Sequence, residues 1–280
     1  MADWRINRGM KTRVIVGAGL AVMLAAALYF GGYVLLTLIT LFSLIAVYEV
    51  GLAFRNRGYN PMLLPAYLFA GTFGFIYVWF GMLSMVSLYI ASIMATMIYS
   101  LFAKTRTTAD VIPAIFIYVY PLLLLMCMLL VYYGFNRSIG LTAACLAIAA
   151  PECSDMMAYF GGTLFGKHKL CPLISPKKTV EGSVCAILGG LLFGGLLIPF
   201  QKLWGGTVNL SVLLSLGLCC GVFSQFGDLF ASTLKRWAGI KDFSSIFPGH
   251  GGIMDRIDSA LFCAPMVLCV FTILSKVGIY

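Results

Sequence analysis

The amino-acid sequence predicts an all-α integral membrane protein of about nine transmembrane helices with a cytosolic N-terminus. Three observations lead to this prediction. The 280 residues are 61% hydrophobic and only 10% charged, whereas roughly 25% of the residues in soluble domains are charged. The apolar residues form continuous runs long enough to cross a bilayer core of about 30 Å, and they do not alternate as in a β-barrel. The basic residues are unevenly distributed between the segments that connect these runs.

Nine apolar runs, separated by charged residues, glycine or proline, are the candidate spans. The first run follows a basic segment, as the apolar part of a signal peptide does. We count it as a span because a second run follows at once and no clear small-x-small cleavage site precedes a soluble domain. The predicted spans are residues 14–29, 33–54, 62–80, 82–103, 111–133, 139–162, 183–200, 210–234 and 258–278.

The distribution of basic residues sets the orientation of these spans. With the N-terminus in the cytosol, the outer segments hold only Arg137, Lys202 and Lys276 of the 19 Lys and Arg residues. This asymmetry follows the positive-inside rule. The net charge of +9 is thus explained by topology and by attraction to anionic membrane lipids. A nucleic-acid partner is not predicted, because the basic residues are spread over several loops and tails and form no stripe.

The chemical character of the chain changes after its first half. We therefore divide it into N-terminal membrane helices, residues 1–150, and a C-terminal membrane region with cytosolic loops, residues 151–280, which is the candidate catalytic region. In the first part Glu49 is unusual, and we attribute it to snorkelling or to pairing with Arg55 near a cytosolic helix end.

Two carboxylates lie near the end of the sixth predicted span. Glu152, Asp155 and Tyr159 are spaced i, i+3, i+7 and share one helix face. A carboxylate inside a membrane span indicates a function by default, although a structural pair with a basic residue is the competing interpretation.

The segment after this span is rich in glycine and lysine. Residues 161–167 fit the Walker A pattern G-x-x-x-x-G-K. However, His168 occupies the position that needs Ser or Thr, and the segment follows a membrane helix instead of a strand. A P-loop is therefore excluded. The loop, which includes Lys177 and Lys178, either sets the topology or binds phosphate.

The seventh predicted span begins after Thr179, which can cap it. This span contains Gly189, Gly190, Gly194 and Gly195 with small-x-x-x-small spacing. Close helix packing is the interpretation that we favour, and a dimer contact is the alternative.

The eighth predicted span carries Ser224, Asp228 and Ser232 at i, i+4, i+8, with Lys235 one turn further on the same face. From the helical rise, Asp228 lies about 27 Å along its span and Asp155 about 24 Å along its own, so both reach a similar depth near the cytosolic boundary. We expect these helices to bring their carboxylates to one level of the membrane.

The last predicted span enters from the same side, and Asp255 and Asp258 share one face at its start. Converging carboxylates repel each other unless they are protonated or bridged by a cation, and oxygen ligands suit Mg²⁺, which substrate phosphates then complete. An ion or proton pathway is the competing interpretation, although the cluster is confined to one membrane face. Six basic residues could clamp phosphates around it: Lys177, Lys178, Lys235, Arg236, Lys241 and Arg256.

The stretch from Ser232 to Asp258 reads S-x-L-K-R-x4-K-D-x-S-x2-F-P-x-H-G-G-x2-D-R-x-D. It resembles the signature of the CDP-diacylglycerol synthases, also called phosphatidate cytidylyltransferases. The motifs G-D-L-F, D-x-x-A-Y-x-x-G and S-P-K-K-T-x-E-G upstream are similar to that family too. The resemblance is firm over residues 151–279 and rests on pattern alone before them. One departure is Ala231, where many members have Glu.

The resemblance implies an Mg²⁺-dependent, all-helical, homodimeric enzyme that converts CTP and phosphatidate into CDP-diacylglycerol and pyrophosphate, and it leaves open a second, monovalent cation. The implied location is a multi-pass position in a bacterial-type inner membrane, with the active site at the cytosolic face. The implied metal ligands are Asp228, Asp255 and Asp258, which with Lys241 and His250 form the catalytic set. The implied substrate-binding residues are Lys177, Lys178, Ser232, Lys235, Arg236, Arg256 and Asp155.

Some roles and alternatives stay open at this point. His250 could contact a phosphate, shuttle a proton, or fix the loop through a backbone hydrogen bond. A CTP-dependent lipid kinase acting on a polyprenol-type alcohol would have a similar composition. An ion-coupled transporter would explain intramembrane carboxylates, but it should show polar residues through both leaflets. The residues that recognise cytosine and the acyl-chain preference are not predicted.

Overall fold

The computed structural model describes residues 8–102, 108–247, 249 and 251–278. The chain forms two compact units, each made of two stretches of sequence. The first unit comprises Met1–Tyr118 and Ala238–Arg256, and the second comprises Val119–Trp237 and Ile257–Tyr280. The predicted division at residue 150 separates the chain by chemistry and stays a prediction.

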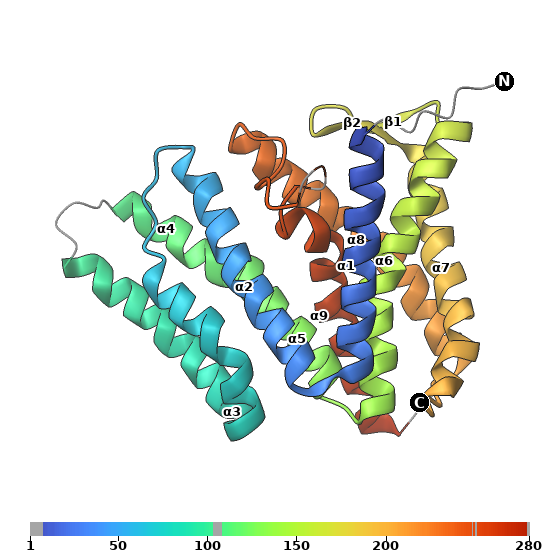
Figure 1. Cartoon of the computed structure of the whole chain (residues 1–280), viewed down its shortest axis with the longest axis horizontal. Helices are drawn as coiled ribbons and strands as arrows, with labels where there is room; N and C mark the ends of the chain where they lie inside the picture. The colour runs from blue at the N-terminus through green and yellow to red at the C-terminus, as the bar shows by residue number, and fades with distance from the viewer. Residues whose placement is uncertain (1–7, 103–107, 248, 250, 279–280) are drawn as a thin grey trace. The chain divides into compact units, whose positions relative to one another are not determined.

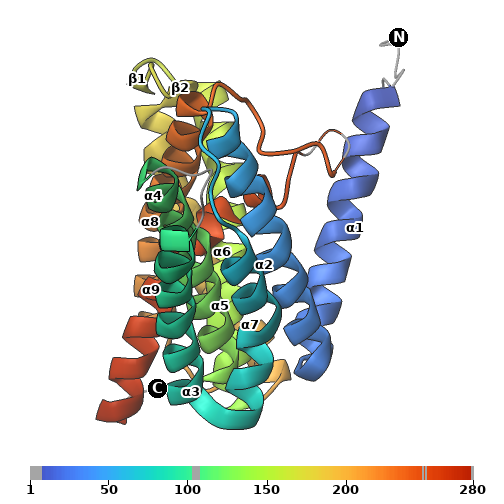
Figure 2. The ribbon, with the colours of Figure 1, turned by 90° about the vertical axis from the view of Figure 1, so that its left-hand side faces the viewer.

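The first unit is built from α1 (Arg8–Phe30), α2 (Gly32–Arg55), α3 (Leu64–Phe102), α4 (Thr108–Ile117) and the first turn of α9 (Met254–Val277). Helix α3 is interrupted at Gly81, whose φ of 83° and ψ of 180° are not helical. Glycine adopts this backbone conformation without the steric cost that a Cβ would add. Figures 1 and 2 show the two arms of α3 running back alongside each other from this point.

The second unit contains most of the π-helical turn η1 (Tyr118–Leu123), followed by α5 (Leu124–Tyr133), α6 (Arg137–Phe165), α7 (Val180–Leu203), α8 (Leu210–Trp237) and the rest of α9. Between α6 and α7 lies an antiparallel hairpin of two short strands, β1 (Lys169–Cys171) and β2 (Ser175–Thr179). The sequence predicts only a loop between these helices, so the hairpin is a feature that the sequence did not indicate. At its end the Thr179 hydroxyl accepts the N–H of Gly182 at 3.1 Å, which confirms the predicted cap.

The described part of the chain contains seven helical segments that are long and apolar enough to cross a membrane, and Val16–Phe30 is a shorter apolar helix. The predicted all-α membrane architecture is therefore confirmed in outline. Helix α3 counts as one of the seven, although the sequence predicts one span before Gly81 and another after it. The number of nine spans stays a prediction. Helix α9 begins at Met254, four residues before the predicted span, so Asp255 lies in its first turn.

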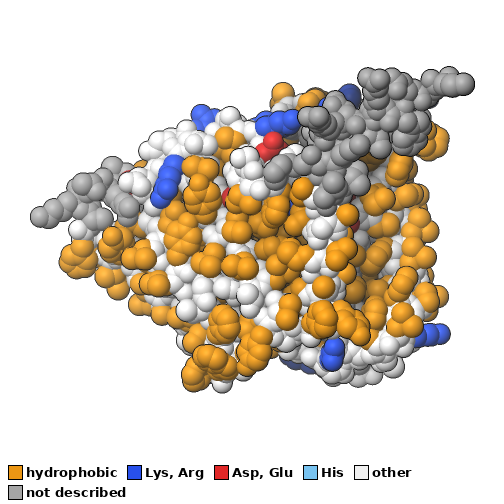
Figure 3. Space-filling model, in the orientation of Figure 1, with side chains coloured by type: hydrophobic (Ala, Val, Ile, Leu, Met, Phe, Trp, Pro, Cys, Tyr) orange, Lys and Arg blue, Asp and Glu red, His pale blue; other side chains and the backbone are white. Residues whose placement is uncertain are grey.

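Large apolar side chains cover much of the helical surface. Leu83 and Leu101 of α3 are each 80% exposed, and Leu164 of α6 is 72% exposed. On the face drawn in Figure 3, hydrophobic side chains cover most of the height, and the visible Lys and Arg side chains lie toward the margins. Continuous apolar surface of this kind is stable in contact with lipid but not in water.

Glycines bring α6, α7 and α8 into close contact in the second unit, where these three helices lie side by side (Figure 1). A Cβ on Gly189 would lie 2.8 Å from the Met157 side chain of α6. A Cβ on Gly190 would collide with the Gly217 carbonyl of α8, and one on Gly194 would collide with that of Leu213. The predicted role of the α7 glycines in close helix packing is confirmed for these three positions.

Two alanine substitutions in α7 should have opposite effects. Gly190→Ala is expected to destabilise the protein by about 1–3 kcal/mol, because the backbone of α8 leaves no room for a methyl group. Gly195→Ala is the matched control: its Cβ would meet only Leu214 Cδ2 at 3.5 Å, and alanine should stabilise the helix by up to about 1 kcal/mol. Thermal unfolding in detergent measures both, and equal shifts in Tm would contradict the close packing of α7 on α8.

Candidate active site

Three helices of the second unit bring their carboxylates together. Asp155 comes from α6, Asp228 from α8 and Asp258 from α9, and the charge of Asp228 acts on both of the others. The Ser259 hydroxyl donates to Asp155 Oδ2 at 3.3 Å and so links α9 to α6. The helical rise predicted Asp155 and Asp228 at one depth, and the side from which the last span enters predicted Asp258 near them. Within this unit the structure places these three carboxylates close enough to interact.

A glycine makes this convergence possible. Gly227 precedes Asp228 on α8, and a Cβ there would collide with the Asp258 carbonyl and lie 3.0 Å from Ser259 Cα. Any larger residue would push α9 away from α8. The neighbouring Ala231, the position at which many members of the resembled family carry Glu, is completely buried. In this chain that position belongs to the packed core of the unit.

Basic side chains balance the charge of these carboxylates, and hydroxyl groups donate hydrogen bonds to them. Lys178 Nζ of strand β2 lies 2.6 Å from Asp228 Oδ2, and the Ser232 hydroxyl donates to Asp228 Oδ1 at 3.2 Å. Lys235 is buried, with 8% of its surface exposed, and its charge acts on Asp258. The hairpin thus carries a cation to the carboxylate cluster, as charge-neutral burial requires.

The hairpin is held in place at its base by Glu181, in the first turn of α7. Glu181 Oε2 accepts the backbone N–H of Lys167 at 3.1 Å, and Glu181 Oε1 lies 2.7 Å from His168 Nδ1. His168 is the residue that rules out a Walker A loop, and residues up to Phe165 are helical, which confirms that exclusion. The lysine-rich segment is therefore a positioned element and not only a topology signal.

In the first unit, the segment of residues 238–253, here called the signature loop, is organised by Asp255. Asp255 Oδ2 accepts the backbone N–H of Phe243 at 2.8 Å and that of Gly252 at 2.9 Å. The N–H of Phe247 donates to the Gly251 carbonyl at 2.9 Å and closes the tip of the loop. Gly251 has a φ of +78°, a conformation that favours glycine. Asp255 thus links two parts of the loop that lie on either side of its tip.

Glu49 of α2 is a second carboxylate bound to the signature loop. It is completely buried, and it accepts hydrogen bonds from the Ser244 hydroxyl at 2.6 Å, the Ile253 N–H at 3.0 Å and the Met254 N–H at 2.8 Å. The interpretation of Glu49 as a snorkelling residue is therefore wrong. Its partners lie about 200 residues away in the sequence, so no local pattern could have identified them.

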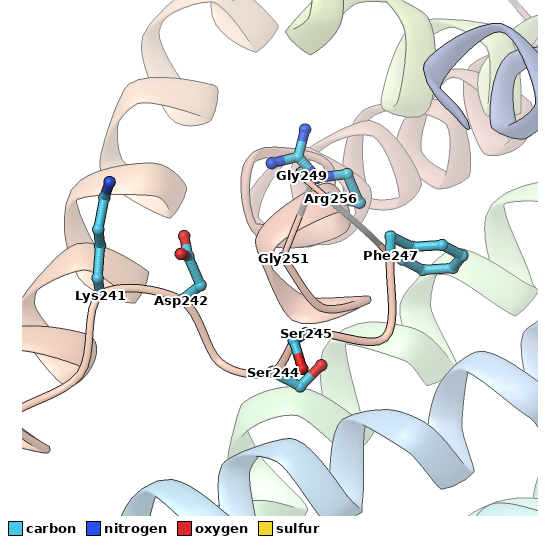
Figure 4. Close-up of a pocket in the computed structure, with 8 residues that line it drawn as sticks. All are labelled: Lys241, Asp242, Ser244, Ser245, Phe247, Gly249, Gly251 and Arg256. Carbon is cyan, nitrogen blue, oxygen red and sulfur yellow. The ribbon is translucent and has the colours of Figure 1, made fainter. Parts of the chain in front are cut away.

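The signature loop surrounds a polar cavity of about 280 Å³. Figure 4 shows the Lys241 and Arg256 side chains on two segments of this cavity, with their charged ends pointing to the same side, and the Phe247 ring pointing away from Lys241. Both cations are exposed at the rim. The remaining lining residues are small or polar: Asp242, Ser244, Ser245, Gly249 and Gly251. Paired cations over glycine backbone are suited to binding phosphate groups.

The other predicted site residues are placed as follows. Lys177 on β2 and Arg236 in the last turn of α8 are exposed. His250 lies outside the described residues. Asp255 belongs to the first unit, whereas Asp228 and Asp258 belong to the second. The set of three as metal ligands therefore stays a prediction.

The chemistry of the second-unit cluster fits a magnesium ion. Mg²⁺ is commonly bound by one or two carboxylates, several waters and substrate phosphates, and not by a complete protein cage. Asp228 and Asp258 supply hard oxygen atoms from adjacent helices. Among the described residues, no group of three or more His, Cys, Asp or Glu side chains could hold a metal ion by itself. Such a site would need substrate oxygens to complete it.

This chain is similar to known cytidylyltransferases. The chain matches the cytidylyltransferase family over residues 11–274. A phosphatidate cytidylyltransferase of Mycobacterium bovis is 31% identical over 285 residues, covering 96% of this chain and 90% of that protein. One of Staphylococcus haemolyticus is 42% identical over 138 residues, covering 49% of this chain and 51% of its own. One of Staphylococcus aureus strain COL is 43% identical over 134 residues, and the matched part spans about half of each staphylococcal relative.

Proposed function

The chain belongs to the cytidylyltransferase family, and we propose on that basis that it transfers the cytidylyl group of CTP to phosphatidate. The products are CDP-diacylglycerol and pyrophosphate. The observation that carries the proposal is the cluster of Asp155, Asp228 and Asp258 with Lys178 and Lys235 near the ends of membrane helices. The names of the relatives from Mycobacterium and Staphylococcus support the same substrates.

The proposed reaction is a direct displacement at phosphorus. A phosphate oxygen of phosphatidate attacks the α-phosphorus of CTP, the bond from that phosphorus to the bridging oxygen breaks, and pyrophosphate leaves with the bonding electrons. Positioning and charge neutralisation provide most of the catalysis in such reactions. No covalent intermediate with a protein side chain is required.

We propose that the cavity at the signature loop receives the polyphosphate of CTP. Lys241 and Arg256 provide two cations on the same side of that cavity, and its lining is largely polar. Lys177, Lys178, Lys235 and Arg236 are proposed to bind phosphate oxygens beside the carboxylate cluster, where Ser232 and Asp155 also lie. The role of His250 stays open among phosphate contact, proton transfer and support of the loop.

We further propose Mg²⁺ as the cofactor, with Asp228 and Asp258 as ligands and Asp255 as the third predicted ligand. When bound, the ion neutralises charge that develops on the phosphate oxygens. Lys178, which pairs with Asp228 at 2.6 Å, is then available to a substrate phosphate. Whether a second, monovalent cation also binds stays open.

The proposed topology has nine spans, a cytosolic N-terminus and an active site at the cytosolic face of a bacterial-type inner membrane. Its support is the concentration of Lys and Arg in the segments assigned to the cytosol. This location suits the reaction, since a water-soluble nucleotide must meet a lipid headgroup there. The homodimer implied by the family resemblance is part of the same proposal.

Transfer of radioactivity from CTP tests this function. The purified protein with phosphatidate and Mg²⁺ should move label from the α-phosphate of CTP into lipid and should require Mg²⁺. Label entering lipid only from the γ-phosphate, with a polyprenol-type alcohol as acceptor, would instead identify a CTP-dependent lipid kinase. Ion flux in proteoliposomes without CTP consumption would favour a transporter.

A further inference from the structure

We propose that Glu49 is a positioning residue for the signature loop and so for the cations that line its cavity. This inference rests on the proposed function, because the loop carries Lys241 and leads to Arg256. Glu49 lies in α2, far from the signature motif in sequence. Within the first unit, its carboxylate accepts hydrogen bonds from Ser244 in the middle of the loop, from Ile253 at its end and from Met254 at the start of α9.

The first argument is the cost of burying Glu49. A carboxylate taken completely out of solvent costs several kcal/mol unless charge-assisted hydrogen bonds compensate. Glu49 is fully buried and accepts three such bonds, at 2.6, 2.8 and 3.0 Å. All three donors come from residues 244–254. The burial cost of Glu49 is therefore compensated only when this segment holds its observed path.

The second argument concerns the start of α9. The first N–H groups of a helix have no partner within that helix and need an external acceptor. Glu49 accepts the N–H of Met254, the first residue of α9, and that of Ile253 just before it, and a carboxylate there also interacts favourably with the helix dipole. Glu49 thus caps α9 from another helix and fixes where its first turn begins. Arg256, at the rim of the cavity, lies in that turn.

The third argument is the double glycine of the signature. A Cβ on Gly251 would lie 2.7 Å from Asp255 Oδ2, and a Cβ on Gly252 would collide with the Glu49 carboxylate. The two glycines therefore provide space for two different carboxylates. Asp255 closes the loop from within, and Glu49 fixes it to α2. The loop geometry at Gly252 depends on a side chain outside the motif.

Glu49→Gln tests the proposal, because it keeps the size of the side chain and removes the charge and one acceptor oxygen. We expect kcat/KM to fall about 10–100-fold, as for loss of a hydrogen bond to a charged group. The KM for CTP should rise more than the KM for phosphatidate. Hydrogen exchange of residues 243–254 in detergent should become faster, while exchange in α6 to α8 stays unchanged. Ser43→Ala is the control, since the buried Ser43 hydroxyl bonds to Ile39 O within α2.

The proposed role of Glu49 can be overturned by several outcomes. Kinetics within twofold of the wild type, or unchanged exchange of residues 243–254, would overturn the proposal. If Glu49→Gln does not fold, Ser244→Ala removes only one of the three bonds and should cause a smaller local increase in exchange. No local increase in that variant would also overturn it. An inactive wild-type protein would refute the proposed function, and the exchange data would still show whether Glu49 holds the loop.

Discussion

Asp228→Asn is expected to reduce turnover of CTP and phosphatidate by about 1000-fold or more. Asparagine removes the negative charge that would hold a cation beside the reacting phosphates, and metal ions provide several kcal/mol of transition-state stabilisation. The variant also loses the ion pair with Lys178. Turnover is measured with phosphatidate in detergent micelles over a range of Mg²⁺ concentrations, and higher Mg²⁺ should not restore it.

Loss of stability is not expected to explain this effect. The side chains of Asp228 and Lys178 are 29% and 25% exposed, and ion pairs with partial access to solvent contribute about 1 kcal/mol or less. The melting temperature should therefore change little. Thr233→Ala on the same helix is the control, because its hydroxyl bonds to Leu229 O within α8 and its side chain is exposed. Asp228→Asn activity near that of the wild type would remove Asp228 from the metal site.

The membrane helices were the most predictable part of the fold, because their signal is local. Continuous apolar runs bounded by charged residues are visible in the sequence, and helices occupy them in the structure. The hairpin of β1 and β2 was missed since strands of three and five residues, rich in lysine, have no alternating apolar pattern. The sequence predicts the start of α9 four residues too late, because charged residues are typical of a loop. Asp255 is in fact favourable in the first turn of a helix.

In the candidate site, too, the features that follow from local helix geometry were predictable, and those that depend on tertiary packing were not. Regular helical rise put Asp155 and Asp228 at one depth, so their proximity could be predicted before the structure was known. The Glu49 contacts could not, because they depend on tertiary packing between segments about 200 residues apart. A buried acid in a membrane helix was the available signal, and the nearby Arg55 offered a simpler local explanation. The partners of an intramembrane acid can thus be distant backbone N–H groups as well as cations.

Asp255→Asn and Asp255→Ala together should separate two functions of one side chain. In the structure a single oxygen, Oδ2, accepts both loop N–H groups, from Phe243 and Gly252. The amide oxygen of asparagine can accept the same two bonds, so Asp255→Asn should leave the loop in place and remove only the charge. If Asp255 also binds the metal ion, turnover should fall about 1000-fold in this variant although the loop is intact.

Asp255→Ala removes the loop bonds as well as the charge. Two buried backbone N–H groups then lose their acceptor, at a cost of about 1–3 kcal/mol each. We expect faster hydrogen exchange in residues 243–254 in the alanine variant but not in the asparagine variant, with turnover abolished in both. If Asp255→Asn instead kept near-normal turnover while Asp255→Ala lost it, Asp255 would be a loop residue only. The metal site would then consist of Asp228 and Asp258, the two carboxylates that already lie together in the second unit.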